Sequence, residues 1–295
     1  MNTPGSTDSA SAPVAPAEFL RRLGQAGDGP YDLASAGLML AALDRPEKKL
    51  APFHAHLAEL AEAVSAQSQF TWHAESAARA LSSIIANHCG YEGEREHYDD
   101  PQNADLMAVI EKRRGLPVAL GIIYIHAARA SGMEACGLLS PGHFLLKVTV
   151  KGSEALIDPF NGGALVESEQ VDAPQFGALS FAVETRGGIE PGRDFPDPLS
   201  PVGDSDVLLR LQNNIKTRAL KARDISRAIE ILKRMTLIAP RRGILWLELA
   251  HLQESLGALS AARGAYETCL ALARPGENIS NEAAFALHAL KRRLN

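Results

Sequence analysis

The sequence predicts an α+β domain followed by an all-helical module, and three features of the 295-residue chain support this fold class. Apolar residues recur at helical spacing from about Ala17 to Asn87. The period changes to two after Gly132, where we expect a small antiparallel sheet. A pair of helical segments then repeats itself in the last third of the chain.

The region before the sheet is expected to be helical. One apolar stripe runs through Leu57, Leu60, Ala61 and Val64. The stretch SAARALSSIIANHCG ends in Gly90, a residue that can cap a helix. After a Pro-Gln-Asn turn, Asn103 is expected to cap a helix that stops at Gly115. Pro117 then opens a second helix, through Ser131, that is apolar on nearly every face and should therefore be central.

The stretch GHFLLKVTVKGSEALIDPFNGG predicts two short antiparallel strands, 143–150 and 155–158. In the first strand the even-numbered positions from Phe144 to Val150 are apolar and the odd-numbered ones are mostly polar. This alternation is typical of a strand with one buried face.

The turn between these strands decides which residues face each other. A turn on Lys151-Gly152 places Asp158 diagonally across from His143 on the same face of the sheet. A turn on Gly152-Ser153 places Asp158 opposite Lys147 instead, out of reach of His143. Both registers are compatible with the sequence.

The segment TRGGIEPGRDFPDPLSPVGDSD is rich in proline and glycine, and we expect it to be a linker. Beyond it, Ala228 aligns with Ala262 in two similar helical segments 34 residues apart, which is the tetratricopeptide period. Two repeats are fewer than an independent solenoid needs, so the module is expected to lean on the first domain. The predicted division is a disordered tail at 1–16, a domain at 17–184, a linker at 185–206 and repeats at 207–295.

Composition excludes several classes of protein. The net charge of −5 gives no reason to expect a nucleic acid or an anionic membrane as partner. Three cysteines, far apart and without a C-x-x-C pair, favour a reducing compartment and no disulfide framework. The first residues lack the basic and apolar regions of a signal peptide, and the longest apolar run is too short to span a bilayer. We therefore expect a cytoplasmic protein.

Several linked motifs, in this order, resemble the SirB-type branch of the transglutaminase-like superfamily. They are YDDPQN, RRGLP, PGHFL and IDPFNGG, and the resemblance covers roughly 17–184 as a domain. Bacterial members of that branch often carry C-terminal tetratricopeptide repeats. The resemblance implies a papain-like fold with a helical N-terminal region and a small antiparallel sheet.

The resemblance also implies a catalytic arrangement that this sequence completes only in part. In the wider fold a Cys at the start of a central helix is activated by a His and an Asp on adjacent strands. His143 and Asp158 match the His and Asp positions, but the Cys position falls at Pro117–Ala119, where no nucleophile is present. Cys136, the thiol nearest the hairpin in sequence, is a weak substitute, and a small buried side chain is its more ordinary role.

The resulting interpretation is a degenerate, non-catalytic domain that acts as a protein- or peptide-binding, regulatory factor. The alternative is a hydrolase or acyl-transferase that uses His143 and Asp158 with a non-standard nucleophile. Candidate binding residues are Arg113, Arg114, Asn161, Asn213 and Asn214. The repeats are expected to form a concave groove that also includes Lys216, Arg218 and Glu248. No metal site and no cofactor are expected.

Overall fold

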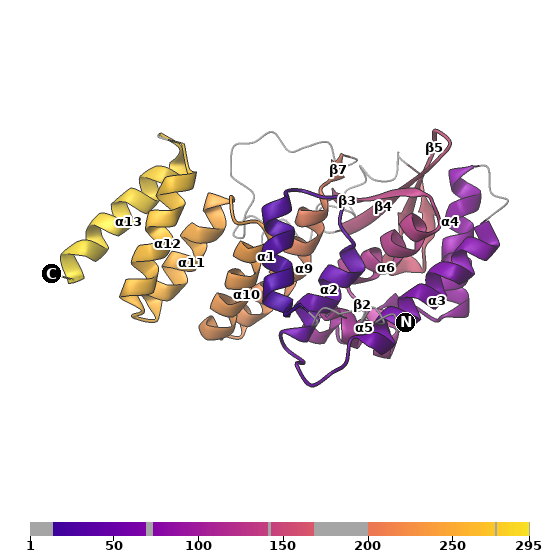
Figure 1. Cartoon of the computed structure of the whole chain (residues 1–295), viewed down its shortest axis with the longest axis horizontal. Helices are drawn as coiled ribbons and strands as arrows, with labels where there is room; N and C mark the ends of the chain where they lie inside the picture. Colours follow the sequence, from indigo (N-terminus) through magenta and orange to yellow (C-terminus); the bar gives the residue numbers. More distant parts are fainter. Residues whose placement is uncertain (1–13, 69–72, 141–142, 168–199, 275, 295) are drawn as a thin grey trace, which may run out of the picture.

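The computed structural model describes residues 14–68, 73–140, 143–167, 200–274 and 276–294. Helices pack against a small sheet in the first part of the chain, and further helices extend to one side (Figure 1). The helices of the first part are α1 (Pro16–Ala26), α2 (Leu33–Ala42), α3 (Ala51–Ser68), α4 (Ala74–Ser82), the π-helix η1 (Ser83–His88), the 3₁₀-helix η2 (Pro101–Ala104), α5 (Leu106–Lys112) and α6 (Pro117–Ala130). The predicted helical N-terminal region is therefore present.

The sheet is antiparallel, with strand order β6-β5-β4-β3-β7. Its strands are β3 (Glu134–Ser140), β4 (His143–Val150), β5 (Ser153–Asp158), β6 (Ala164–Val166) and β7 (Pro201–Val202). The 3₁₀-helix η3 (Pro159–Asn161) joins β5 to β6. A separate parallel pair consists of β1 (Glu92–Gly93) and β2 (Arg114–Gly115).

The turn between β4 and β5 lies on Lys151-Gly152, the first of the two registers considered above. Val150 pairs with Ser153 and Leu146 with Ile157. Lys151 and Gly152 have φ angles of 49° and 81°, which is the conformation that a two-residue hairpin turn requires.

The central helix α6 packs against one face of the sheet, where Phe144, Leu146 and Val148 are buried. The Phe144 ring lies between Gly121 of α6 and Gly137 of β3. A Cβ atom on Gly121 would lie 2.1 Å from Cε1 of this ring, so only glycine permits the close approach of helix and sheet. On the opposite face, a second apolar cluster consists of Leu138, Leu145, Leu156 and Val166.

Five further helices follow the sheet in the described part of the chain. They are α9 (Asp204–Lys221), α10 (Ile225–Ile238), α11 (Gly243–Ser255), α12 (Leu259–Leu272) and α13 (Asn278–Leu294). Helices α10 and α12 both begin and end 34 residues apart, as the repeat predicts. Ala228 and Ala262, the aligned small residues, are fully buried where the helices approach closely.

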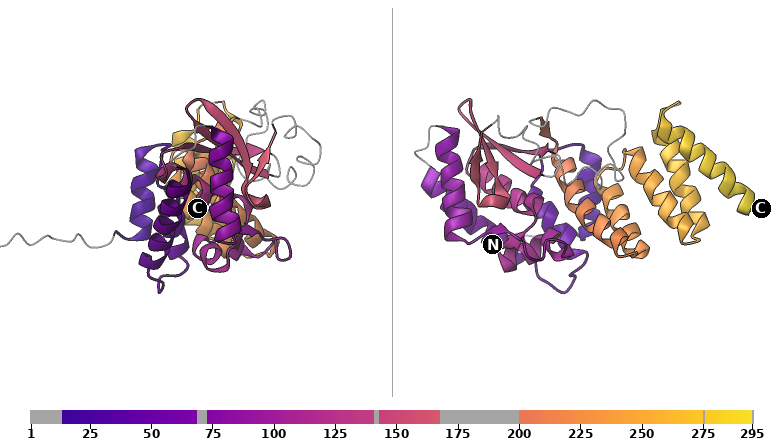
Figure 2. Two further views of the ribbon diagram at one scale, coloured as in Figure 1. Left: turned by 90° about the vertical axis from the view of Figure 1, so that its right-hand side faces the viewer. Right: turned by 180° about the vertical axis from the view of Figure 1, so that it is seen from behind.

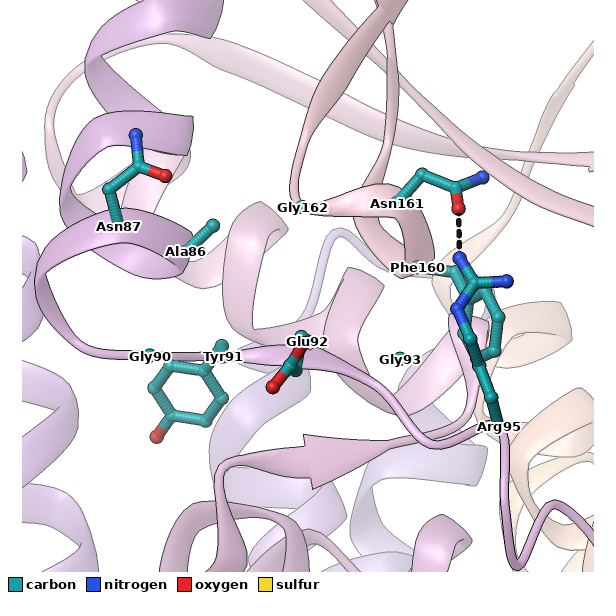
Figure 3. Close-up of a pocket in the computed structure, with 10 residues that line it drawn as sticks. All are labelled: Ala86, Asn87, Gly90, Tyr91, Glu92, Gly93, Arg95, Phe160, Asn161 and Gly162. Atoms are coloured by element: carbon teal, nitrogen blue, oxygen red, sulfur yellow. Dashed lines mark hydrogen bonds between the residues drawn. The ribbon is translucent and has the colours of Figure 1, made fainter.

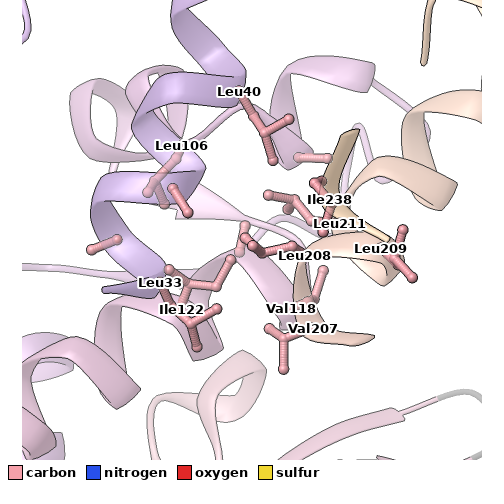
Figure 4. Packing of buried hydrophobic residues seen from close by; sticks show 14 of the residues in the cluster. Leu33, Leu40, Leu106, Val118, Ile122, Val207, Leu208, Leu209, Leu211 and Ile238 are labelled. Atoms are coloured by element: carbon pink, nitrogen blue, oxygen red, sulfur yellow. The ribbon is translucent and has the colours of Figure 1, made fainter. Parts of the chain in front are cut away.

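The first repeat pair, α9 and α10, shares the hydrophobic core of the first domain. Side chains of α2, α5, α6, α9 and α10 pack in one cluster (Figure 4). Helix α1 packs on α10, and α9 packs on α2, α6 and η2. These contacts confirm that the repeat module packs against the first domain.

Helices α11, α12 and α13 extend from α10 to one side and form what we call the arm, residues 243–294; the remaining described elements form the body (Figures 1 and 2). The main contacts of the arm are with α10 and among its own helices. None of the helices seen in the described ranges combines the length and the apolar character that a membrane span requires.

Two expected boundaries were wrong. Asn103 does not cap the helix before α6, because residues 101–104 form a 3₁₀-turn of their own. Asp105 caps α5 instead, accepting a hydrogen bond from the backbone N–H of Ala108 (2.9 Å). The helix ends at Lys112 and not at Gly115, since Arg113 adopts a left-handed conformation (φ 59°).

The expected linker at 185–206 lies mostly outside the described residues. Within it, Pro201 and Val202 form the edge strand β7, which pairs with Leu138 and Gly137 of β3. The first residues of α9 also fall in this range.

Candidate functional site

The start of α6 is where the resemblance places a nucleophile. Pro117, Val118 and Ala119 occupy the first turn after Leu116. Val118 and Ala119 are buried in the core, at 1% and 0% exposure. The sequence from Ala104 to Ala130 contains no Ser, Thr or Cys, so the helix offers no hydroxyl or thiol nucleophile near this end.

Asp158 ends β5 and is buried. Its Oδ1 accepts hydrogen bonds from the backbone N–H groups of Phe160 (2.9 Å) and Asn161 (3.2 Å). Its Oδ2 accepts from the Asn161 side-chain amide (2.5 Å). Both oxygens therefore hold the turn of η3, which is the role of an N-capping carboxylate.

His143 begins β4, and its backbone pairs with Ser140 of β3. In the observed register Asp158 follows Ile157, the partner of Leu146, on the strand beside β4. The side chain of His143 lies outside the described part of the structure, so the pairing of His143 with Asp158 stays a prediction.

Tyr124 lies on α6, and its side chain is fully buried. Its hydroxyl has no hydrogen-bond partner among the described residues. Burial, reinforced by the nearby negative charge of Asp158, raises the pKa of Tyr124 above its usual range. The phenol is therefore neutral at physiological pH, and the sequence pattern gave no signal for it.

The cysteines are not placed as activated thiols. Cys136 lies on β3 opposite Lys147. Burial raises the pKa of the Cys136 thiol, and the opposing charges of Lys147 and Arg129 do not overcome it. Burial also raises the pKa values of Cys89 and Cys269. A raised pKa disfavours the thiolate, the form that attacks an electrophile.

Arg113 belongs to a cluster that the sequence did not reveal. Its guanidinium donates hydrogen bonds to His56 Nε2 (2.5 Å) and to the Tyr91 hydroxyl, and lies over the Tyr91 ring at 4.7 Å. The His56 Nε2 atom is also 2.9 Å from the Tyr91 hydroxyl. Burial and the positive charge of Arg113 lower the pKa of His56. The negative charge of Glu59 acts in the opposite direction but does not outweigh them. His56 is thus held neutral as a hydrogen-bond acceptor.

This cluster joins segments that are far apart in the sequence: α3 carries His56, Tyr91 precedes β1, and Arg113 follows α5. A pattern read along one segment cannot detect such a contact. Arg114, the neighbouring candidate, forms an ion pair with Glu92 across the β1–β2 pair.

Asn161 lines a cleft of about 450 Å³ beside η3 (Figure 3). The residues that line this cleft, here called the η3 cleft, are Ala86, Asn87, Gly90, Tyr91, Glu92, Gly93, Arg95, Phe160, Asn161 and Gly162. Arg95 donates a hydrogen bond to the side-chain oxygen of Asn161 and lies over the Phe160 ring at 5.0 Å. The volume of the η3 cleft is in the range of small-ligand sites.

A stack of side chains connects the η3 cleft to the repeats. Phe160 meets Tyr98 edge to face, with ring centroids 6.0 Å apart. The guanidinium of Arg218 on α9 lies 5.6 Å from the centre of the Tyr98 ring. Arg218 also donates hydrogen bonds to the backbone oxygens of Tyr98 (2.8 Å) and Asp99 (3.0 Å).

The repeat residues expected in a groove are engaged by the protein itself. Arg218 donates to the backbone and side-chain oxygens of Asn214 as well as to residues 98 and 99. Lys216 is buried and forms a 2.6 Å ion pair with Glu248 of α11. The side-chain oxygen of Asn213 is buried without a hydrogen-bond partner in the described part of the chain. The structure thus joins Asn214 with Arg218 and Lys216 with Glu248.

Among the described residues no group of three or more His, Cys, Asp and Glu side chains is arranged to hold a metal ion.

Comparison with known families gives two matches that together span most of the chain. The family described as the transglutaminase-like superfamily matches residues 51–213. The tetratricopeptide repeat matches residues 215–295.

Similar curated proteins include bacterial relatives. A UPF0162 protein of Xylella fastidiosa (strain 9a5c) is 29% identical over 182 residues, which cover 58% of this chain and 62% of the relative. A UPF0162 protein of Vibrio cholerae is 30% identical over 134 residues, covering 44% and 49%. The matches therefore span less than two thirds of the length of these relatives.

A solved structure of menin, described as revealing its binding site for Mixed Lineage Leukemia protein, shows a weaker likeness. It has a TM-score of 0.41 and 12% sequence identity over 89% of this chain and 71% of menin.

Proposed function

The chain belongs to the transglutaminase-like superfamily, and we propose that it is a non-catalytic member that binds a protein or peptide through its tetratricopeptide repeats. The observation that carries this proposal is the start of α6. A nucleophile is required there, and the chain instead places Pro117 followed by the buried side chains of Val118 and Ala119.

Two further observations support the proposal that the domain has lost catalytic activity. Both carboxylate oxygens of Asp158 accept hydrogen bonds from the turn of η3, so this residue has a structural role that needs no imidazole partner. Cys136 is the thiol nearest to the hairpin in sequence, and burial stabilises its protonated form.

Within the superfamily we assign the chain to the SirB-type branch, on the linked motifs YDDPQN, RRGLP, PGHFL and IDPFNGG. We propose the division into a tail at 1–16, a catalytically degenerate domain at 17–184, a linker at 185–206 and repeats at 207–295. The relatives in bacteria and the repeat architecture fit a regulatory factor of the bacterial cytoplasm.

The arm is the part of the repeat module that we propose for partner binding. Tetratricopeptide repeats generally mediate protein–protein interactions. Helix α9 of the first pair is packed on η2, whereas the arm leaves Leu256, Leu272 and Phe285 exposed. The acidic charge of the chain favours neither a nucleic acid nor an anionic membrane in this role.

The non-catalytic half of the proposal is tested with ester, peptide-amide and glutamine substrates. We expect no turnover above that of the double variant His143→Ala/Asp158→Asn. A thiol-directed electrophile should label Cys136 no faster in the wild type than in His143→Ala at pH 7. Turnover that requires both His143 and Asp158 would instead establish the hydrolase or acyl-transferase alternative.

The binding half is tested with the full-length chain as bait in a native lysate, with recovered proteins quantified by mass spectrometry. Phe285→Ser changes an exposed side chain of α13, and Ala284→Ser is its matched control one position away. We expect a partner that is recovered by the wild type and by Ala284→Ser and is depleted with Phe285→Ser. Equal recovery by all three chains would contradict binding through this face of the arm.

A further inference from the structure

The η3 cleft lies outside the expected catalytic arrangement. None of Pro117–Ala119, His143 and Asp158 is among its lining residues. Three segments form it: the π-helix η1, the stretch from Gly90 to Arg95, and the turn of η3 (Figure 3). The cleft therefore does not include the positions of the expected catalytic residues.

The cleft carries one positive charge that the protein does not balance. Arg95 makes no ion pair within the described ranges, and its guanidinium contacts the Asn161 side-chain oxygen and the Phe160 ring. Glu92, the acidic residue of the lining, is already paired with Arg114. Arg95 is thus the cationic side chain of the lining, on a chain whose net charge is −5.

Arg95 is held in place, although its side chain is exposed. The ring of Phe160 lies beneath its guanidinium at 5.0 Å, and Phe160 is itself fixed by the edge of Tyr98. Asn161 accepts a hydrogen bond from one terminal nitrogen and is in turn anchored to Asp158. A guanidinium oriented in this way retains N–H donors for a planar acceptor, and a carboxylate matches them in geometry and charge.

The other rim of the cleft offers a neutral amide. Asn87 is exposed on η1 and has no hydrogen-bond partner in the described part of the chain, so its side chain is available both to donate and to accept. The π-helix that presents Asn87 is a rare conformation found frequently at functional sites. Beside it, Gly90 leaves open space where a side chain would stand.

We propose that the η3 cleft binds a single carboxylate of an acidic peptide, with Arg95 as the ion-pairing residue and Asn87 as a hydrogen-bonding partner of the peptide amides. A volume of about 450 Å³ is larger than a lone carboxylate needs and admits neighbouring peptide groups. The carboxylate comes from an Asp or Glu side chain or from a chain end.

The test uses a random heptapeptide library selected on the full-length wild-type chain, with each selected peptide synthesised in free-acid and amidated forms. Affinities are measured by fluorescence anisotropy at low and at physiological salt. We expect enrichment of carboxylates and at least tenfold weaker binding to Arg95→Gln. Arg79→Gln, an exposed arginine of α4 whose ion pair is long at 3.9 Å, is the matched control and should leave the affinity unchanged.

The amidated peptides separate the two sources of carboxylate. Loss of affinity on amidation identifies a chain end, and loss on replacing Asp or Glu by Asn or Gln identifies a side chain. Asn87→Asp, which adds a negative charge at the opposite rim, should also weaken binding and serves if Arg95→Gln fails to fold.

Selection of no peptide, selection without a preference for carboxylates, or affinities unchanged in both cleft variants would overturn the proposal. Because Phe285 lies on the arm, Phe285→Ser should leave peptide affinity intact, so failure of the cleft and failure of the repeat-binding proposal are distinguishable.

Discussion

The two helix pairs of the repeat module share one sequence period but have different surroundings. The first pair, α9 and α10, is built into the body, where α10 packs on α1 and α9 packs on α2, α6 and η2. The second pair, α11 and α12, packs mainly on α10, on itself and on α13. A repeat therefore specifies how two helices pack on each other, while the residues outside the repeat pattern decide what else they contact.

Charged residues show the difference clearly. The buried carboxylate of Asp204, at the start of α9, accepts two hydrogen bonds from Arg129 of α6 (2.6 and 2.9 Å). Asp44, just after α2, accepts hydrogen bonds from both Arg227 and Arg234 of α10. Ion pairs among the arm helices are mostly exposed, and such pairs contribute little to stability. Four predictions test this contrast.

The largest effect is expected from helical glycines, because the same substitution should have opposite signs in body and arm. A Cβ on Gly24 of α1 would lie 2.0 Å from the backbone oxygen of Leu237 on α10. Gly24→Ala must separate the two helices, and we expect a loss of about 3 kcal/mol in the free energy of unfolding. Gly264 of α12 has no atom within 4 Å of that position. Gly264→Ala should stabilise by about 0.5–1 kcal/mol, through better helix propensity alone.

Urea denaturation followed by circular dichroism measures both variants. Equal losses in the two would show that the arm is packed as closely as the body, and the contrast drawn above would fail.

The second prediction concerns Asp204. Arg129→Met preserves most of the side-chain volume but removes the cationic partner of the buried Asp204 carboxylate. Among the described residues, this carboxylate then keeps the backbone N–H of Tyr31 as a donor. We expect a loss of about 2 kcal/mol, typical of a buried charge deprived of one hydrogen-bonded partner. Arg263→Met, on an exposed pair of α12, should change stability by less than about 0.5 kcal/mol. Thermal unfolding of both variants at low and high salt distinguishes these outcomes, and equal losses would contradict the prediction.

The third prediction adds pH. Burial tends to raise the pKa of Asp44, but hydrogen bonds from Arg234 and Arg227 outweigh it and hold the value at about 2, below its ordinary 3.8. A carboxylate with a lowered folded-state pKa stabilises the protein fully above pH 3.8, and this contribution is lost as the pH falls through about 2. Asp44→Asn should therefore cost about 1.5 kcal/mol at pH 7, and the cost should shrink between pH 4 and pH 2.

Urea titrations of Asp44→Asn and the wild type at pH 7, 4 and 3 give this difference directly, with Glu267→Gln in the arm as control. A cost that does not change with pH would mean that the ionised carboxylate is not what joins α2 to α10.

Much of the fold could be predicted because its signals are local. The 34-residue spacing of Ala228 and Ala262 placed two helices, and the alternation after His143 placed β4. The hairpin register was limited to two choices, since Gly152 fits either of two turn positions, and the backbone adopted the one on Lys151-Gly152. The edge strand β7 was missed, because two residues within a Pro-rich segment carry no alternation.

The candidate site was less predictable because its contacts are long-range. The motif around Asp158 was recognised, but a resemblance of motifs does not say which donors its carboxylate accepts hydrogen bonds from. The hydrogen bonds of His56 and Tyr91 with Arg113 join three separate segments. The hydrogen bonds from Arg218 of α9 to the backbone oxygens of residues 98 and 99 depend on how the segment before η2 packs. The period of the repeat contains no information about that packing.

The smallest effect on stability is expected at Phe285, which is 79% exposed on α13. Its ring buries little surface, so Phe285→Ser should change the free energy of unfolding by less than about 0.5 kcal/mol. Leu287, two residues along the same helix, is 7% exposed, and Leu287→Ser should cost about 3 kcal/mol because it removes a core side chain and buries a hydroxyl. Hydrogen exchange of the α13 amides, measured for both variants, reports the arm separately from the body. Faster exchange in Phe285→Ser would show that this ring packs on a surface of its own chain, and the free face that distinguishes the arm from the first repeat pair would not exist.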